Sequence, residues 1–196
     1  MKHKNFLISS NGRSGTMFLS TIMNKSKKWE VNHEPRGEYE ENLYKTGNSV
    51  DKKIIKDFEK DYYGEVNSRL RFFFNDINTY KKGIIFREPK DIITSVVNRN
   101  KNPNEVIRII NEVNIFWLKF KEWLEINPKI LKIEFNLMVK DATYLSNVLD
   151  FFEIDDVKID NTLLTTKINQ NPQIEFKTFQ DIPNEYKQEY KKLKWE

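Results

Sequence analysis

The chain has 196 residues and a formal net charge of +4, and it contains no cysteine. Hydrophobic residues make up 38% and charged residues 32%, which is typical of a folded globular protein rather than a disordered one. The missing cysteines exclude disulfides and thiolate metal sites. No apolar run is long enough to cross a bilayer, and the first one is too short for a signal peptide. We therefore expect one cytoplasmic domain, residues 1–196, that makes no membrane contact.

Short apolar runs alternate along the chain with segments of helical periodicity. This alternation predicts an α/β fold of three layers, in which helices flank a mostly parallel central sheet. Ligands of such sheets bind beyond the carboxyl ends of the strands. Residues 161–181 show no clear period. The predicted strands are residues 6–10, 29–32, 83–86 and 130–135, and the predicted helices are residues 15–24, 50–62, 91–98, 103–124, 141–152 and 183–193.

A glycine-rich turn, NGRSGT, joins the first predicted strand to the first predicted helix. Gly12 and Gly15 allow the backbone to turn tightly and to approach an anion closely. The amides at the helix start would point at that anion, and the helix dipole favours negative charge there. Arg13 adds a guanidinium suited to phosphate or sulfate oxygens. An ordinary glycine turn capped by Ser14, with Arg13 in solvent, would contain the same residues. The predicted anion-binding residues of this P-loop-type arrangement are Gly12, Arg13, Ser14, Gly15, Thr16 and Met17.

A second strand–turn–helix motif, GIIFREPKDIITS, begins at residue 83. Arg87 stands at the end of the predicted strand, and Ser95 follows eight residues later in the predicted helix. Arginine can bind a phosphate through two hydrogen bonds, and the serine hydroxyl on its short side chain can donate another. Taken alone, the motif also fits an Arg87 paired with Glu88 or Asp91 on the surface, and a Ser95 packed on the sheet.

Together the two motifs resemble the sulfotransferases that use 3′-phosphoadenosine-5′-phosphosulfate (PAPS). GRSGT is similar to the loop of the tyrosylprotein and bacterial-type branch, although Met17 stands where that branch commonly has a second threonine. The resemblance implies that the loop holds the 5′-phosphosulfate and that Arg87 and Ser95 hold the 3′-phosphate. A weaker match at TTKINQ implies further nucleotide contacts from Lys167 and Asn169.

Two ionisable residues, His33 and Glu34, follow the second predicted strand. Sulfuryl transfer needs a base that takes the proton of the acceptor hydroxyl, and a cation such as Arg13 that stabilises the departing phosphate. Glu34 lies 21 residues after Arg13, with Arg36 two residues further on, and the resemblance associates these offsets with a catalytic glutamate and a neighbouring arginine. His33 is a chemical alternative, since its ordinary pKa of about 6.5 suits a base. Adjacent strand residues point to opposite faces, so we expect one of the two in the site.

The segment GEVNSRLR departs from the family pattern. Asn67 fits, but Ser68 stands where the family usually has a lysine near the bridging oxygen, and the following proline is absent. Arg69 or Arg13 could supply the missing charge. The predicted residues on the substrate side are Arg36, Asn67 and Arg69.

The resemblance implies in-line transfer of the sulfuryl group of PAPS to a hydroxyl or amine of a sugar, a peptide or another small molecule, leaving 3′-phosphoadenosine-5′-phosphate (PAP). A non-catalytic PAP- or PAPS-binding module would keep the same loops. A P-loop kinase would need a Gly-Lys-Ser/Thr loop, which is absent. The basic residues are scattered among acidic ones, so nucleic acid is not an expected partner. We expect no metal, because there are two histidines and no carboxylate cluster beside the loop.

Overall fold

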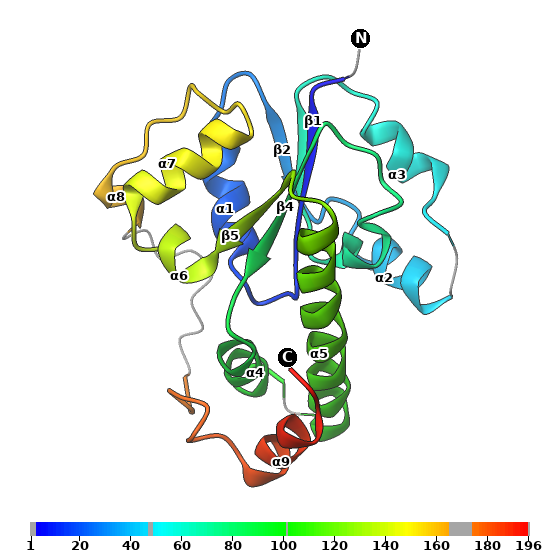
Figure 1. The fold of residues 1–196 in the computed structure, drawn as a ribbon, viewed down its shortest axis with the longest axis vertical. Helices are drawn as coiled ribbons and strands as arrows, with labels where there is room; N and C mark the ends of the chain where they lie inside the picture. Colours follow the sequence, from blue (N-terminus) through cyan, green and yellow to red (C-terminus); the bar gives the residue numbers. More distant parts are fainter. Residues whose placement is uncertain (1–2, 47–48, 101, 165–173, 196) are drawn as a thin grey trace.

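The structure, a computed structural model, describes residues 3–46, 49–100, 102–164 and 174–195 (Figure 1). Its described strands form one sheet in which every neighbouring pair is parallel. The order β2-β3-β1-β4-β5 places β1 between β3 and β4. The loops that leave β1 and β4 therefore start side by side at the carboxyl edge. The strands are β1 (Asn5–Ser10), β2 (Glu30–His33), β3 (Tyr63–Val66), β4 (Lys81–Phe86) and β5 (Ile130–Glu134).

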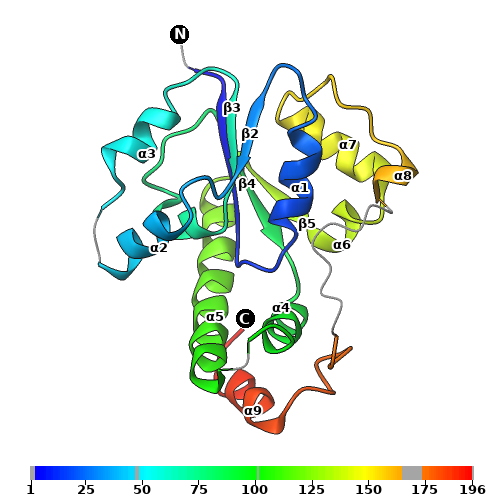
Figure 2. The ribbon, with the colours of Figure 1, turned by 180° about the vertical axis from the view of Figure 1, so that it is seen from behind.

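Helices cover both faces of the sheet, so the predicted three-layer α/β fold is confirmed. In Figure 2, α1, α6, α7 and α8 lie to one side of the strands and α2 and α3 to the other. None of the described helices is long and apolar enough to span a membrane. The helices are α1 (Thr16–Met23), α2 (Glu38–Lys45), α3 (Lys52–Asp57), the 3-10 helix η1 (Arg69–Phe73), α4 (Pro89–Val97), α5 (Pro103–Ile126), α6 (Phe135–Met138), α7 (Ala142–Phe151), α8 (Asn161–Leu164) and α9 (Asn184–Lys192).

The largest difference from the predicted elements lies at residues 50–62, where the predicted helix is too long. The helix α3 ends at Asp57, and the chain then enters β3, a strand that the sequence pattern did not predict. Gly64 and Glu65 are weak strand formers, so the sequence pattern of this segment does not indicate a strand. A Cβ on Gly64 would lie 2.1 Å from the ring of Phe6, so the strand needs a glycine where that ring crosses it. The short elements α2, η1, α6 and α8 were also not predicted.

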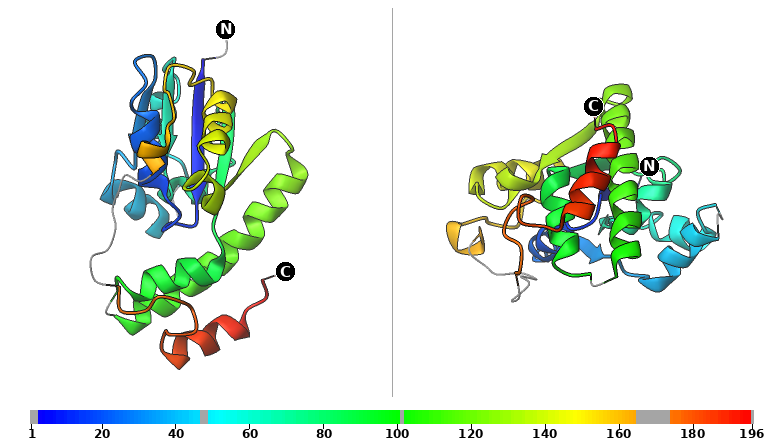
Figure 3. Two further views of the ribbon diagram at one scale, coloured as in Figure 1. Left: turned by 90° about the vertical axis from the view of Figure 1, so that its left-hand side faces the viewer. Right: turned by 90° about the horizontal axis from the view of Figure 1, so that it is seen from below.

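Alternate residues of β1 pack on opposite faces of the sheet, as strand geometry requires. Phe6 and Ile8 belong to the core formed with α1 and α7. Leu7 belongs to the core formed with α3, η1 and the C-terminal half of α5, where Phe120 is buried. A third apolar cluster joins α4, the N-terminal half of α5 and α9, beyond the carboxyl edge of the sheet (Figure 3). The long helix α5 thus links the sheet to this outlying cluster.

Candidate functional site

A cavity of 910 Å³ lies at the carboxyl edge of the sheet, between the loop after β1, η1, α4 and the N-terminal half of α5. It gathers most of the residues that the sequence singled out. Arg36 and Asn67 are not among the residues that line it, and Lys167 and Asn169 lie outside the described residues. The predicted residues that line the cavity are Gly12, Arg13, Ser14, Gly15, Thr16, Met17, His33, Glu34, Arg69, Arg87 and Ser95.

The loop between β1 and α1 is held in a left-handed conformation, with φ of 73° at Gly12, 49° at Arg13 and 78° at Gly15. A Cβ on Gly15 would lie 2.8 Å from the ring of Phe135, so the loop packs directly on α6. Ser14 is fully buried, and its hydroxyl donates to the carbonyl of Gly12 at 2.7 Å. The N-cap residue of α1 is Gly15 rather than Ser14. The first amides of a helix lack carbonyl partners within it, so an anion at this loop would find donors.

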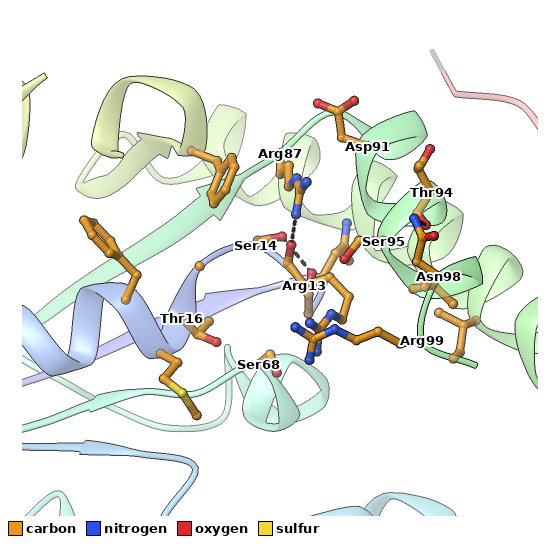
Figure 4. Close-up of a pocket in the computed structure, with 18 of the residues that line it drawn as sticks. Arg13, Ser14, Thr16, Ser68, Arg87, Asp91, Thr94, Ser95, Asn98 and Arg99 are labelled. Atoms are coloured by element: carbon orange, nitrogen blue, oxygen red, sulfur yellow. Dashed lines mark hydrogen bonds between the residues drawn. The ribbon is translucent and has the colours of Figure 1, made fainter. Parts of the chain in front are cut away.

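Two arginine side chains, Arg13 and Arg87, enter the cavity from neighbouring strand ends (Figure 4). The guanidinium of Arg87 donates to the carbonyl of Arg13 at 2.5 Å and lies 4.5 Å from the ring centre of Phe135. The Nε atoms of both arginines are buried and have no hydrogen-bond partner among the residues that the structure describes. Burial lowers the pKa of Arg13 to about 10, with further lowering by the charges of Arg99 and Arg87. Burial also lowers the pKa of Arg87, which Asp91 partly opposes. Both guanidiniums are therefore short of negative charge.

Helix α4 carries the next part of the cavity wall. Ser95 lines the cavity from this helix (Figure 4). Arg99, which the sequence analysis missed, lies in the turn directly after α4 and also lines the cavity. The signal available in the sequence was a basic residue just beyond the end of the predicted helix that carries Ser95.

His33, the last residue of β2, and Glu34, which follows it, both line the cavity, so the expectation that one of the two would point away was wrong. Glu34 leaves the strand in a left-handed conformation, with φ of 44°, and this breaks the strand alternation. His33 lies with its Nε2 3.1 Å from the hydroxyl of Thr16. Burial lowers the pKa of His33, opposed by the charge of Glu34 and assisted by that of Arg69. The imidazole is therefore neutral at pH 7.

The carboxylate of Glu34 is held by two neighbours from the start of η1. Ser68 donates its hydroxyl to one oxygen, and the Nε of Arg69 donates to the other at 3.0 Å. Ser68, the departure from the expected lysine, thus contacts the candidate base itself.

Arg36 lies behind the cavity in a network of carboxylates. Its guanidinium donates to Asp57 at 2.8 Å, to Glu65 at 2.6 Å and to Glu40 at 3.0 Å. Burial lowers the pKa of Arg36, but the charges of Glu65 and Glu40 outweigh this and raise it above its usual value. With its donors occupied in this way, Arg36 serves the fold, contrary to the predicted place on the substrate side.

Asn67 joins this network to the turn that holds Glu34. Its side-chain amide donates to Glu40 at 2.8 Å and to Glu65 at 2.9 Å. Its side-chain oxygen, Oδ1, accepts from the backbone amides of Arg69 and Leu70 at 3.0 and 3.2 Å. Asn67 is fully buried, so its place is also structural rather than on the substrate side.

No family model and no curated protein matches this chain. Solved structures do. A sulfotransferase from Alicyclobacillus acidocaldarius aligns with a TM-score of 0.57 and 15% identity, over 86% of this chain and 87% of that one. The sulfotransferase domain of the Synechococcus PCC 7002 olefin synthase aligns with a TM-score of 0.52 and 14% identity, over 99% of this chain and 90% of that one. The sulfotransferase domain from the curacin biosynthetic pathway aligns with a TM-score of 0.50 and 16% identity, over 99% of this chain and 92% of that one. The chain therefore has a sulfotransferase-like fold.

Proposed function

We propose that this protein transfers the sulfuryl group of PAPS to an acceptor hydroxyl or amine. The observation that carries the proposal is the pair of half-buried guanidiniums of Arg13 and Arg87, at adjacent strand ends of a sulfotransferase-like fold, each with a buried Nε that has no partner among the described residues. Partly desolvated cations without a paired carboxylate are costly, so a ligand with two separate anionic groups accounts for both. PAPS has a phosphosulfate and a 3′-phosphate, and a nucleoside triphosphate has no second anionic group.

In this proposal the loop from Gly12 to Met17 holds the 5′-phosphosulfate, and Arg87 and Ser95 hold the 3′-phosphate. Arg99 adds positive charge beside Arg13, where its effect on the pKa of Arg13 places it within electrostatic range. As the acceptor oxygen attacks sulfur, the bond from sulfur to the bridging oxygen breaks, and negative charge develops on the departing phosphate. Arg13 and the amides at the start of α1 would stabilise that charge.

Glu34 is the proposed base, and it would take the proton of the acceptor as the new bond to sulfur forms. Ser68 and Arg69 orient its carboxylate toward the cavity, which is the positioning that a base requires. Since neutral His33 is held by Thr16 beside the anion-binding loop, we assign it to orienting that loop rather than to taking the proton.

A non-catalytic PAP-binding module is the second candidate, and one observation favours it. Both oxygens of the Glu34 carboxylate already accept hydrogen bonds, and each such bond weakens a base. The module would bind the nucleotide in the same way and transfer nothing.

The deciding experiment measures sulfuryl transfer from labelled PAPS to a panel of sugars, phenols, tyrosine peptides and amines, with PAP and ADP binding followed by calorimetry. We expect PAP to bind at least tenfold more tightly than ADP, because each charge-assisted hydrogen bond contributes about 1.5–3 kcal/mol, and we expect at least one acceptor to be sulfated. Tight PAP binding without any transfer would favour the module. Equal affinities for PAP and ADP would contradict both candidates.

A further inference from the structure

Glu40 is a buried acid that the proposed function does not yet use. It lies on α2, is fully buried, and forms part of the cavity wall. It shares the single guanidinium of Arg36 with Glu65 and Asp57. If all three carboxylates were ionised, this network would carry an excess of negative charge away from water, which is unfavourable.

The hydrogen bonds of Glu40 are unevenly divided between its two oxygens. Arg36 and Asn67 both donate to Oε1, at 3.0 and 2.8 Å. Oε2 is buried and has no hydrogen-bond partner among the described residues. A buried, ionised carboxylate oxygen without a hydrogen-bond donor is costly, whereas a neutral, protonated carboxyl in the same place costs less. The geometry therefore leaves one place for a proton, on Oε2.

The charged groups around Glu40 come from several elements. Arg36, in the turn before α2, contributes the positive charge that acts on Glu40. The negative charges are Asp57 at the end of α3, Glu65 on β3 and Glu34 after β2. Burial raises the pKa of Glu40 to about 7; Arg36 and Asn67 oppose the rise, and the charges of Glu65 and Glu34 add to it. Tyr63 on β3 donates its hydroxyl to Glu65 at 2.6 Å, and burial raises its own pKa, so it stays neutral.

We propose that Glu40 is a titrating positioning residue for Glu34: protonated on Oε2 at low pH, it releases this proton to solvent as the pH rises, and its ionised form adds negative charge behind the base, which favours proton transfer from the acceptor. This inference rests on the proposed function, in which Glu34 takes the acceptor proton.

Two physical links connect the residues. The first link is electrostatic: the charge of Glu34 favours a proton on Glu40, so each carboxylate is sensitive to the charge of the other. Asn67 provides the second link. It donates to Glu40 and accepts from the amide of Arg69, whose side chain donates to Glu34. A change of charge at Glu40 is therefore felt at the turn that holds the base.

The inference makes opposite predictions for stability and for rate. In the unfolded chain the Glu40 carboxyl has its ordinary pKa near 4.5, and in the folded chain it has the raised value of about 7. Between these values the folded state holds the extra proton, so its contribution to stability is present at low pH and is lost as the pH rises through about 7. The transfer rate rises over the same range.

The first test needs no turnover. Thermal and urea unfolding of the full chain without nucleotide are measured from pH 5 to 8.5 for the wild type and for Glu40→Gln. We expect the unfolding equilibrium of the wild type, relative to Glu40→Gln, to shift toward unfolding on the order of 100-fold over this range. An exposed acid, Glu59, supplies the control, and Glu59→Gln should keep the wild-type pH dependence. If wild type and Glu40→Gln have the same pH dependence, Glu40 does not titrate and the inference is overturned.

The second test is the pH–rate profile with saturating PAPS and acceptor. We expect kcat of the wild type to rise roughly two- to tenfold between pH 6 and 8, because the added negative charge favours proton transfer to Glu34 and a general-base rate follows a fraction of that gain. Glu40→Gln should stay at the low-pH rate, and His33→Asn should keep the rise. A rise that persists in Glu40→Gln, or disappears in His33→Asn, overturns the coupling.

If Glu40→Gln does not fold, infrared spectra of the wild type replace both comparisons. A protonated carboxyl band that disappears around pH 7 together with the rise in rate supports the inference, and no such band overturns it. A wild type that shows the stability change but sulfates no acceptor contradicts the proposed function and supports the titration of Glu40, so the two failures are distinguishable.

Discussion

Arg36 on one hand, and Arg13 and Arg87 on the other, have opposite electrostatic surroundings. Arg36 donates to three carboxylates, and its pKa is raised. Arg13 and Arg87 are also substantially buried, but no carboxylate of the described residues pairs with either, and their pKa values are lowered. The residue type is the same in both places. Under the proposed function, Arg36, which has its counter-charges within the fold, stabilises the fold, whereas Arg13 and Arg87, which have no paired carboxylate among the described residues, bind the anionic ligand.

The largest expected effect concerns Glu34, the proposed base. Glu34→Gln keeps the size and hydrogen bonding of the side chain but removes its ability to accept a proton. We expect kcat to fall about 10²–10⁴-fold, the usual contribution of a general base, with little change in PAP affinity. His33→Asn should cost much less. If His33→Asn abolishes transfer and Glu34→Gln does not, the assignment of the base is wrong.

The next effect tests the arginine that has its counter-charges. Arg36→Met leaves Glu40, Glu65 and Asp57 without their shared cation. We expect a loss of about 3–5 kcal/mol in the free energy of unfolding, as when one partner of a buried ion pair is removed. The matched control is Arg108→Met, because Arg108 is exposed and pairs with Glu105 and Glu112 on α5; exposed pairs contribute about 1 kcal/mol or less. Equal losses in the two variants would remove the distinction.

The arginines without counter-charges should matter for the ligand instead. Arg87→Ala should erase the preference for PAP over ADP, a change of tenfold or more, because it removes a charge-assisted contact to the 3′-phosphate. Calorimetry with both nucleotides measures it. Arg71→Ala, which changes a cavity-lining arginine on η1, should keep the preference. A preference that survives in Arg87→Ala would mean that the 3′-phosphate binds elsewhere.

The smallest effect has the opposite sign to that of Arg36. Arg13→Met removes a desolvated cation with an unpartnered Nε, so the unliganded protein should lose no stability, or should gain up to about 1 kcal/mol. Urea unfolding without nucleotide measures this, and PAP affinity should fall in the same variant. A marked loss of stability would show that Arg13 already has the role in the fold that we assign only to Arg36.

The sequence predicted the parts of the site that depend on local order. The turn with Gly12 and Gly15, and the eight-residue spacing of Arg87 and Ser95, can be seen within single strand–turn–helix units. The place of Arg36 could not be seen, because its partners lie on α3 and on β3, and β3 has no strand signal of its own. The contact of Ser68 with Glu34 depends on the same unpredicted strand, which brings the start of η1 to the end of β2.

The long helix α5 has a consequence for how the molecule opens. Phe116 and Phe120 in its C-terminal half pack on the sheet, whereas Val106 and Ile110 in its N-terminal half pack with α4 and α9. The cavity therefore spans two units that can unfold locally with different free energies, and Ser95 belongs to the outlying one. A ligand that contacts both units binds only while α4 and α9 are in place, so its binding raises the free energy of locally unfolding these helices. Amide hydrogen exchange in α9, whose residues are not among those that line the cavity, should slow when a nucleotide binds.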